Sequence, residues 1–595
     1  MRAGEITAAL LLCAAVIAGS AATAEEDGVE AQLDALMAEY WRYVLDEDPV
    51  AATRAGIDRG NDRLPAVTQA DLGRRLAEER RFRARVRDLD RQALGESDRL
   101  NAELFDWVLT DSIDAAELDL ARIPFNTFSG FFMTALTASS GVRMDTVADY
   151  EAYLARLRDI PRYFDENVAN MERGARDGFV LPQVVIDGVL PTLAAQVKDD
   201  PEASSFYEPF REMHARIPAA AQARLRAKAR DAIAGDVMPA FARLARYLET
   251  EYAAASAIGA GELPRGEDYY AFQIRRYTTL PDVTADEIHR TGLEEVRRIR
   301  AEMDAIIADL GFEGDFAAFA EFLRTDPQFY AQTAEELLQQ AAWIAKRIDF
   351  VMPGYFGHLP RQPYGVVPVP DEIAPNYTTG AYFAGPRGGN HGGAFWVNTH
   401  DLDQRPLYEL PALTLHEAVP GHHHQNAIAL EMQSAPEFRK DLYFSAFGEG
   451  WALYAEKLGV EMGIYRTPYE HFGRLSYEMW RACRLVIDTG IHSQGWTRRQ
   501  ALDFMADNTS LSQGNIRAEI DRYISWPGQA LAYKLGELRI HAMRREAESL
   551  LAARFDLREF HDVLLENGAL PMAMLEARIA RYIDERLAAA SPAGR

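Results

Sequence analysis

A histidine followed directly by a glutamate, His416 and Glu417, is the pair in this sequence best suited to chemistry. The pair stands in the segment LTLHEAVPGHHHQ, residues 413–425. In a His-Glu-x-x-His helix, two histidines one turn apart hold a zinc ion, and the adjacent glutamate takes a proton from an activated water. Here the position four residues after His416 is occupied by Pro420. The question is whether a metal site survives this altered spacing.

Pro420 and Gly421 predict a break in the helix that carries His416. Proline has no N–H, and its ring clashes with the carbonyl four residues earlier, whereas glycine accepts unusual backbone angles. A break that loops out about two residues would return His422 to the place of a second ligand. In an unbroken helix His423 would share a face with His416, but two turns, about 10 Å, would separate them. We therefore expect His422 to be the second ligand, with His423 as the alternative.

A third ligand is expected at Glu449, in the downstream segment FGEGWALYAE. Catalytic zinc sites use three protein ligands, and a carboxylate in an apolar segment needs a partner such as a metal. Glu456 could support this site or serve as an alternative ligand, although a structural role is the simpler interpretation. The competing interpretations are a surface cluster of histidines and a helix-start role for Glu449.

Other polar residues could bind the substrate or stabilise an oxyanion. His492, Tyr523 and Tyr533 are candidate oxyanion donors, and each could equally be a buried structural residue. Arg484 and Arg522 could hold a substrate carboxylate, and ordinary ion pairing is the alternative for both.

Four segments occur in the order HEAVPGHHHQ, FGEGWALYAE, RLVIDTGIHSQGWT and RYISWPGQALAYKLG. Together they resemble bacterial domain-of-unknown-function family 885, which is similar to the helical zinc peptidases of the thimet oligopeptidase and angiotensin-converting enzyme type. The resemblance implies a mostly α fold with two helical lobes around a deep channel, and a short strand region beside the metal-site helices. It implies that His416 and Glu449 are ligands and that Glu417 is the general base.

The resemblance also implies substrate contacts. It places His492, Tyr523 and Tyr533 among the substrate and oxyanion donors. The segment GGAFWVNT is similar to the edge strand on which those enzymes lay a peptide, which makes Gly393, Ala394 and Phe395 candidate substrate-binding residues.

Hydrophobic periodicity predicts helix through most of the chain. Thr284 and Glu287 have the spacing of a capping box, followed by apolar residues at helical intervals and by Gly311. The main irregular region, about residues 352–404, contains the expected strand. We predict a signal peptide at residues 1–24, an N-terminal helical region at 25–270 and a catalytic helical region with the metal site at 271–595.

Composition excludes some classes of partner. The formal net charge of -26 argues against nucleic acid and anionic membranes. A positive start, a short apolar run and small residues up to Ala24 predict export, with an N-terminal membrane anchor as the alternative. After cleavage Cys483 would be the one remaining cysteine, which excludes an intramolecular disulfide.

These observations lead to one functional hypothesis and two rivals. The hypothesis is a periplasmic or secreted zinc (Zn2+) metallohydrolase, most simply a peptidase of short peptides, without stable membrane association once the signal is removed. The first rival is a metal-dependent hydrolase of a non-peptide amide or ester. The second is an exported, non-catalytic, metal-containing binding protein, against which Glu417 argues because a structural zinc needs no base beside it.

Overall fold

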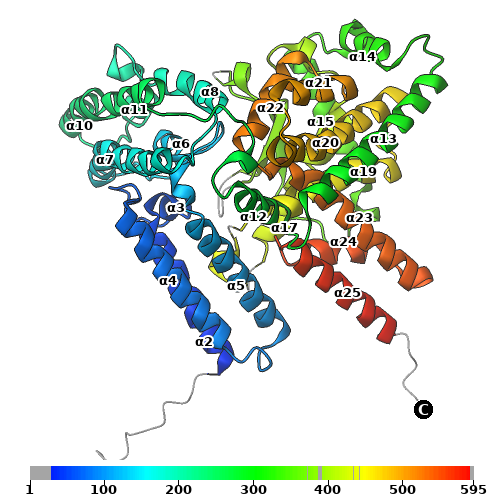
Figure 1. Ribbon diagram of the computed structural model, residues 1–595, viewed down its shortest axis with the longest axis horizontal. Helices are drawn as coiled ribbons and strands as arrows, with labels where there is room; N and C mark the ends of the chain where they lie inside the picture. Colours follow the sequence, from blue (N-terminus) through cyan, green and yellow to red (C-terminus); the bar gives the residue numbers. More distant parts are fainter. Residues whose placement is uncertain (1–27, 372, 386–390, 433–434, 441, 590–595) are drawn as a thin grey trace, which may run out of the picture.

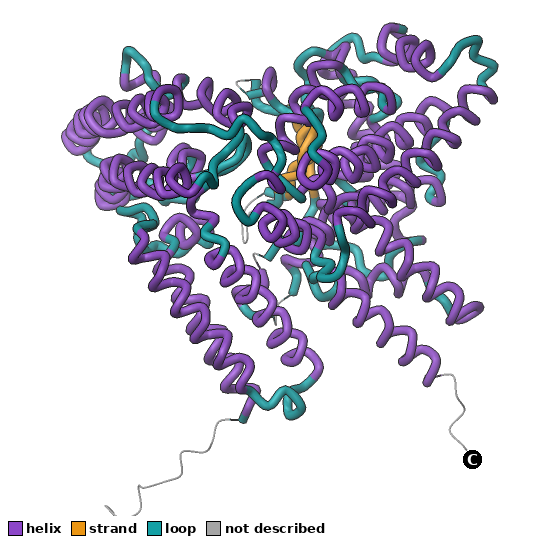
Figure 2. The backbone as a smooth tube through the Cα atoms, viewed as in Figure 1, coloured by secondary structure: helices purple, strands orange, loops and turns teal. Residues whose placement is uncertain are grey.

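The computed structural model describes residues 28–371, 373–385, 391–432, 435–440 and 442–589. Helices make up most of this part of the chain, and the strands form one small patch within them (Figure 2). The predicted signal peptide, residues 1–24, lies outside the described residues. Among the described helices, none combines the length and apolar character needed to cross a membrane.

The N-terminal part of the chain forms one group of helices (Figure 1). Residues between Val50 and Tyr252 build a hydrophobic core of their own there. The helices are α2 (Val29–Glu47), α3 (Pro49–Arg54), α4 (Gln69–Asp88), α5 (Glu96–Glu117), α6 (Phe131–Leu136), α7 (Val147–Asp177), α8 (Gln183–Ala194), α9 (Glu208–Arg211), α10 (Ala219–Ala232) and α11 (Met238–Thr250).

The remaining helices form the second group, in which α13 packs along α20 and α19 packs along α23. The prediction of a mostly helical chain in two lobes is confirmed. These helices are α12 (Gly266–Thr278), α13 (Ala285–Asp309), α14 (Phe316–Thr325), α15 (Ala334–Val351), α16 (Leu410–Glu417), α17 (His422–Leu430), α18 (Glu437–Lys440), α19 (Ser445–Glu461), α20 (Pro468–Gln494), α21 (Arg498–Asn508), α22 (Gln513–Ser525), α23 (Ala532–Leu551), α24 (Leu557–Leu565) and α25 (Met572–Ala589).

No single position in the sequence separates the two groups of helices. Helices α2, α4 and α5 share a core with the second group, where the Phe105 ring lies 5.4 Å from the Phe438 ring. Residue 270 lies inside α12, so a boundary there would divide a helix. The change from one core to the other falls earlier, between Tyr252 and Ala260.

Local signals in the sequence explain individual helices. Thr284 and Glu287 form the predicted capping box at the start of α13, and Gly311 follows its end with a φ of 65°. The buried stripe of α13 ends at Ile307, and the adjacent Ile306 is only partly buried. Cys483 is buried in the core that α13 and α20 share.

The strand region is a three-stranded sheet of order β1-β3-β2, made of β1 (Tyr364–Pro368), β2 (Gly380–Phe383) and β3 (Gly393–Val397). The strand β3 is parallel to β1 and antiparallel to β2. It is therefore the middle strand and not the predicted edge strand. Ala394 and Phe395 are paired with a strand on both sides, so they have no free edge on which a peptide could pair, whereas Gly393 is paired with β1 alone. Phe395 is also fully buried.

Candidate metal centre

The helix breaks where the Pro-Gly pair predicts. Helix α16 ends at Glu417 and α17 begins at His422, with a cis peptide bond between Val419 and Pro420 in the link. The backbone N–H of Gly421 donates to the carbonyl of Leu415 at 3.0 Å, and the indole N–H of Trp451 donates to the carbonyl of Pro420 at 2.7 Å. Backbone and side chain thus satisfy the groups that the break releases.

Glycine is required at position 421 by close packing. A Cβ atom on Gly421 would collide with the carbonyl oxygens of His416 and Leu415. Only a residue without a side chain lets the link fold back against the end of α16. The link therefore brings the start of α17 next to His416.

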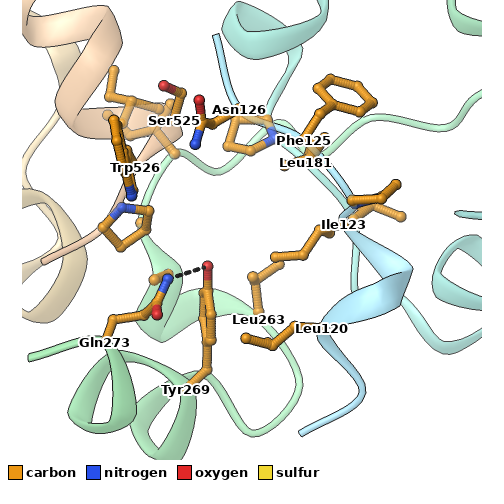
Figure 3. A pocket seen from close by; sticks show the side chains of 18 of the residues that line it. Leu120, Ile123, Phe125, Asn126, Leu181, Leu263, Tyr269, Gln273, Ser525 and Trp526 are labelled. Atoms are coloured by element: carbon orange, nitrogen blue, oxygen red, sulfur yellow. Dashed lines mark hydrogen bonds between the residues drawn. The ribbon is translucent and has the colours of Figure 1, made fainter. Parts of the chain in front are cut away.

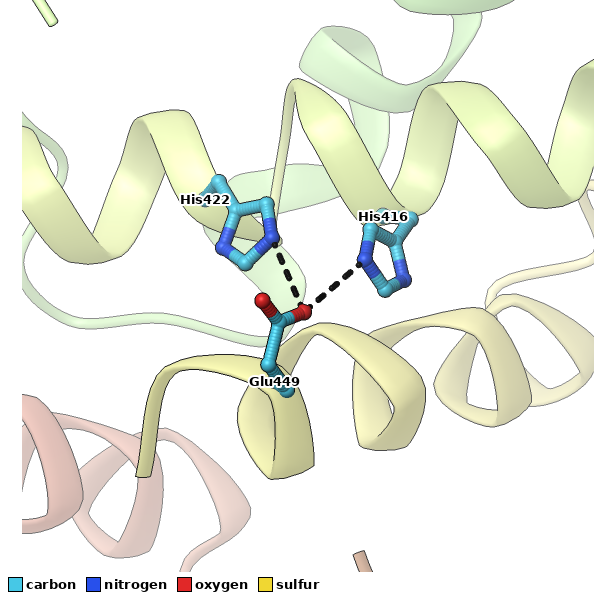
Figure 4. A group of neighbouring side chains, drawn as sticks. All are labelled: His416, His422 and Glu449. Carbon is cyan, nitrogen blue, oxygen red and sulfur yellow. Dashed lines mark ion pairs between the residues drawn. The ribbon is translucent and has the colours of Figure 1, made fainter. Parts of the chain in front are cut away.

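The structure brings His416, His422 and Glu449 together (Figure 4). Their ligand atoms all lie within 4.8 Å of one another. The Oε2 atom of Glu449 is 3.5 Å from Nε2 of His416 and 3.4 Å from Nε2 of His422. Two imidazole nitrogens and one carboxylate oxygen form the donor set of a catalytic zinc site, so these residues fit the ion.

The two neighbouring histidines face elsewhere. The ring of His423 lies between the sheet and a loop, with Tyr382 Oη 3.1 Å from Nδ1 and the Gln362 carbonyl 3.0 Å from Nε2. His424 packs against Phe356 at 4.6 Å. Burial lowers the pKa of His423 to about 4 and that of His424 to about 3, so both are neutral core histidines.

Glu456 holds His416 in orientation. The Nδ1–H of His416 donates to Glu456 Oε1 at 2.8 Å, and Arg481 Nη2 lies 3.6 Å from the same oxygen. This bond leaves Nε2 of His416 as the acceptor that faces Glu449, and a carboxylate on the second ring nitrogen is the usual support of a metal-ligating histidine. Glu456 is thus a supporting residue here, and the pattern of the sequence did not single out Arg481.

The two glycines beside Glu449 each admit a close neighbour. A Cβ on Gly448 would lie 2.5 Å from the ring of Tyr443, and one on Gly450 would lie 2.5 Å from the backbone of Gly536 in α23. The hydroxyl of Tyr443 donates to Glu449 Oε1 at 3.0 Å. Because Oε1 is occupied in this way, Oε2 is the oxygen that faces the histidines.

Tyr443 was missed from sequence. Its ring is 53% exposed although its hydroxyl touches a ligand residue. It lies just before α19 and outside the FGEGWALYAE segment, so neither helical periodicity nor a motif marks it. One signal in the sequence could have pointed to Tyr443. Glu449 lies one turn after the start of α19, so the residues just before that helix lie close to it.

Glu417 lies at the end of α16, next to His416, and is partly buried. Within the described ranges its carboxylate has no hydrogen bond and no ion pair. An acid without a partner beside the ligand group is available to take up a proton.

The charges of the ligand group are strongly coupled. Burial alone would lower the pKa of His416, but its contacts with the carboxylates of Glu449 and Glu456 outweigh burial and raise the pKa to about 9. Burial alone would raise the pKa of Glu449, but the two histidines hold it well below its usual range. The site therefore keeps an anionic carboxylate that two imidazoles share.

Two predicted oxyanion donors have their groups engaged elsewhere. His492 accepts from the N–H of Ala260 at 3.0 Å through Nδ1 and bonds the Tyr523 carbonyl at 3.0 Å through Nε2. The Tyr523 hydroxyl donates to Glu519 at 2.6 Å and accepts from Arg484 at 2.8 Å. Both residues are buried, and these contacts do not favour a catalytic role for either.

Arg484 is engaged as well. It is buried and bonds Tyr523 and Glu519, the second at 3.1 Å. Arg522 also bonds Glu519, at 2.9 Å. This set, Arg484, Glu519, Arg522 and Tyr523, is called the arginine cluster below. Its contacts favour the ion-pairing interpretation over direct binding of a substrate carboxylate.

Tyr533 is the predicted donor whose phenol is affected by the charge of a ligand residue, Glu449. Its ring stacks under the Arg484 guanidinium at 4.4 Å. Burial raises the pKa of its phenol, and the nearby Glu449 carboxylate raises it further. Tyr443 and Tyr533 are therefore the two tyrosines with evidence of proximity to Glu449.

A cavity of about 550 Å³ has neither Glu417 nor a residue of the ligand group in its wall, but the charge of Glu417 acts on two tyrosines that line it. Its wall includes Tyr377 and Tyr477, and the pKa of each phenol is raised first by burial and then by nearby carboxylates that include Glu417. A volume of this size accommodates a short peptide or another small ligand.

A second cavity, of about 230 Å³, lies where the N-terminal helices meet α12 and the end of α22 (Figure 3). Its wall combines apolar side chains with polar groups, and the Gln273 amide donates to the Tyr269 hydroxyl at 3.2 Å. Neither Glu417 nor a residue of the ligand group lines it.

The fold and the ligand group define a helical protein with a candidate metal centre. The chain matches the model of the family described as bacterial protein of unknown function, DUF885, over residues 49–579. The match covers most of the chain, so this protein belongs to that family, as the four sequence segments predicted.

Two solved structures share the fold, with TM-scores above 0.7. A candidate lipoprotein from Colwellia psychrerythraea is 27% identical, with a TM-score of 0.86 over 94% of this chain and 100% of its own. A candidate lipoprotein of unknown function from Shewanella oneidensis is 18% identical, with a TM-score of 0.71 over 92% of this chain and 99% of its own. The M32 carboxypeptidase from Deinococcus radiodurans R1 reaches 13% identity and a TM-score of 0.35, over 87% and 96%. No curated protein matches this chain.

Proposed function

We propose that this protein is an exported zinc-dependent metallohydrolase that cleaves short peptides. One observation carries the proposal. His416, His422 and Glu449 converge on one point, while Glu417 stands beside them without a partner among the described residues. A purely structural zinc favours four closed protein ligands and needs no base nearby.

The residues have distinct roles in this proposal. His416, His422 and Glu449 hold the ion, which when bound supplies Lewis-acid activation of water and of the scissile carbonyl. Glu417 accepts a proton from the attacking water and passes it to the leaving amine. Glu456 keeps His416 oriented through the 2.8 Å bond to Nδ1.

Stabilisation of the oxyanion is assigned to a tyrosine. Tyr533 is the predicted residue that we choose, because the charge of Glu449 acts on its phenol, which also bonds the Gln529 side chain. The groups of His492 and Tyr523 bond other parts of the protein. A phenol that donates to the developing negative charge lowers the barrier most when the site excludes bulk water.

Hydrolysis of a non-peptide amide or ester would use the same residues, and the aromatic wall of the 550 Å³ cavity accommodates either substrate class. A panel of short peptides tested beside small esters and amides separates the two. The N-terminal segment and the lipoprotein relatives support export to the periplasm or the medium.

The test is metal content measured by mass spectrometry on protein purified without chelator or His-tag, together with peptide turnover. We expect about one zinc per chain and turnover that a chelator abolishes. Metal binding without hydrolysis of any peptide, amide or ester would instead favour the binding protein. Absence of bound metal after zinc is added back would overturn the proposal.

A further inference from the structure

The wall of the 550 Å³ cavity carries an arginine without a partner. Arg405 lines the cavity and is partly buried, and its Nε atom is shielded from solvent without a hydrogen bond. No carboxylate among the described residues lies within ion-pair distance of its guanidinium. Burial lowers the pKa of Arg405 in spite of the surrounding acids, so their charges do not offset the cost of desolvation.

The nearby arginines are different. Arg324 lines the same cavity, but it bonds Glu321 at 3.0 Å and the carbonyl of Ser510 at 3.3 Å. Arg484 lies behind the wall residue Glu519 and bonds it at 3.1 Å. A buried charge is costly unless an opposite charge compensates it, and Arg405 is the arginine of this set that lacks one.

The acids nearest Arg405 do not take this role. Glu409 lines the cavity too, but burial raises its pKa to about 8, so it is mostly protonated at neutral pH. Asp403 is exposed to solvent. An anionic group of a ligand in the cavity would supply the missing partner.

We propose that Arg405 binds a carboxylate of the substrate, so that this site takes peptides that carry a carboxylate at the end lying in the cavity. The inference rests on the proposed function, because Glu417 would then act on the peptide bond next to the residue whose carboxylate Arg405 binds. A guanidinium matches a carboxylate through two parallel hydrogen bonds. The carboxylate is either the C-terminus of the peptide or an acidic side chain.

Binding measured by calorimetry tests the inference independently of turnover. The protein is the zinc-loaded chain with Glu417→Gln, so that bound peptides survive. The ligands are acetyl-Ala-Phe-Ala as the free acid, the same peptide as its amide, and acetyl-Ala-Phe-Glu amide. Each is measured with Arg405 intact, with Arg405→Gln, and with Arg324→Gln as the matched control from the same cavity.

We expect the free acid to bind roughly 10- to 100-fold more tightly than the amide, as suits a charge-assisted hydrogen-bonded pair. Arg405→Gln should remove this preference and Arg324→Gln should keep it. If the Glu amide binds as tightly as the free acid, a side-chain carboxylate serves as well as the C-terminus. If only the Glu amide binds more tightly than the plain amide, the carboxylate comes from a side chain. If it binds like the plain amide, the C-terminus is recognised.

Equal binding of all three peptides, no binding of any, or a preference that survives Arg405→Gln would overturn the inference. Arg405→Lys keeps the charge but loses the planar guanidinium, so its preference for the free acid over the amide should be intermediate. This variant tests the inference if Arg405→Gln does not fold. Wild-type turnover of the same peptides tests the proposed function separately. Carboxylate-dependent binding without hydrolysis would leave this inference standing and sink the peptidase.

Discussion

The arginine cluster and the ligand group differ in how their charged groups are hydrogen-bonded to one another. In the arginine cluster, Glu519 accepts hydrogen bonds from Arg484, Arg522 and Tyr523. In the ligand group, His416 and His422 instead direct Nε2 at the same oxygen of Glu449 at 3.5 and 3.4 Å, longer than hydrogen bonds.

Shifted pKa values occur in both clusters and do not distinguish them. Arginines hold the pKa of Glu519 at about 2 against the effect of burial, just as histidines hold that of Glu449 low. The difference lies in geometry. In the arginine cluster the two arginines and the tyrosine bond one carboxylate directly. The ligand group instead aims two imidazole nitrogens and one carboxylate oxygen at one point, beside an acid without a partner among the described residues.

The largest expected effect separates the adjacent histidines. His422→Ala should abolish zinc binding, because it removes one of three ligands, and turnover should be lost with it. His423→Ala should keep about one zinc per chain, since its ring bonds the sheet and a loop. Metal content by mass spectrometry checks both variants, and zinc loss in His423→Ala with retention in His422→Ala would reverse the assignment.

Glu417→Gln should reduce kcat by about 10²- to 10⁴-fold while metal content stays unchanged, because it removes the proton acceptor and none of the ligands. Steady-state turnover and metal analysis of the same sample give the answer. A matched change at the exposed Glu335, which lies at the start of α15 and outside both the ligand group and the cavity wall, should leave kcat within the range of wild type. Full turnover in Glu417→Gln would rule out the proposed base.

Tyr443→Phe should weaken zinc binding by about 10- to 100-fold, because the hydroxyl that orients Glu449 is lost. Gly448→Ala should act in the same direction by displacing the Tyr443 ring. Competition with a chelator of known affinity measures the change. Tyr382→Phe, which removes a hydroxyl next to His423, is the control and should leave zinc affinity unaltered.

Glu519→Gln should leave the metal in place and lower the free energy of unfolding by about 3 kcal/mol, the cost of breaking a buried ion pair. The two arginines would lose their shared counter-charge. Urea denaturation followed by circular dichroism measures the loss. Release of zinc without loss of stability would mean that the arginine cluster belongs to the metal centre after all.

Local sequence signals anticipated much of this fold. The helical content, the capping box at Thr284 and the break at Pro420 and Gly421 follow from periodicity, side-chain bonding and steric exclusion within a few residues. The same signals indicated the strand β3 but not its neighbours. Its middle position depends on where β1 and β2 return, which no local pattern encodes.

The sequence by itself determined the candidate ligands and base, His416, Glu417, His422 and Glu449, because the residue types and the broken helix carry the chemistry. Only the tertiary structure decided that Tyr443 orients Glu449 and that Glu456 and Arg481 support His416. It also decided that Arg405 has no partner among the described residues, while Arg484 has one. Those facts depend on contacts between residues far apart in the chain, and the physical reason is that hydrogen bonds and ion pairs form between atoms near in space, whatever their separation in sequence.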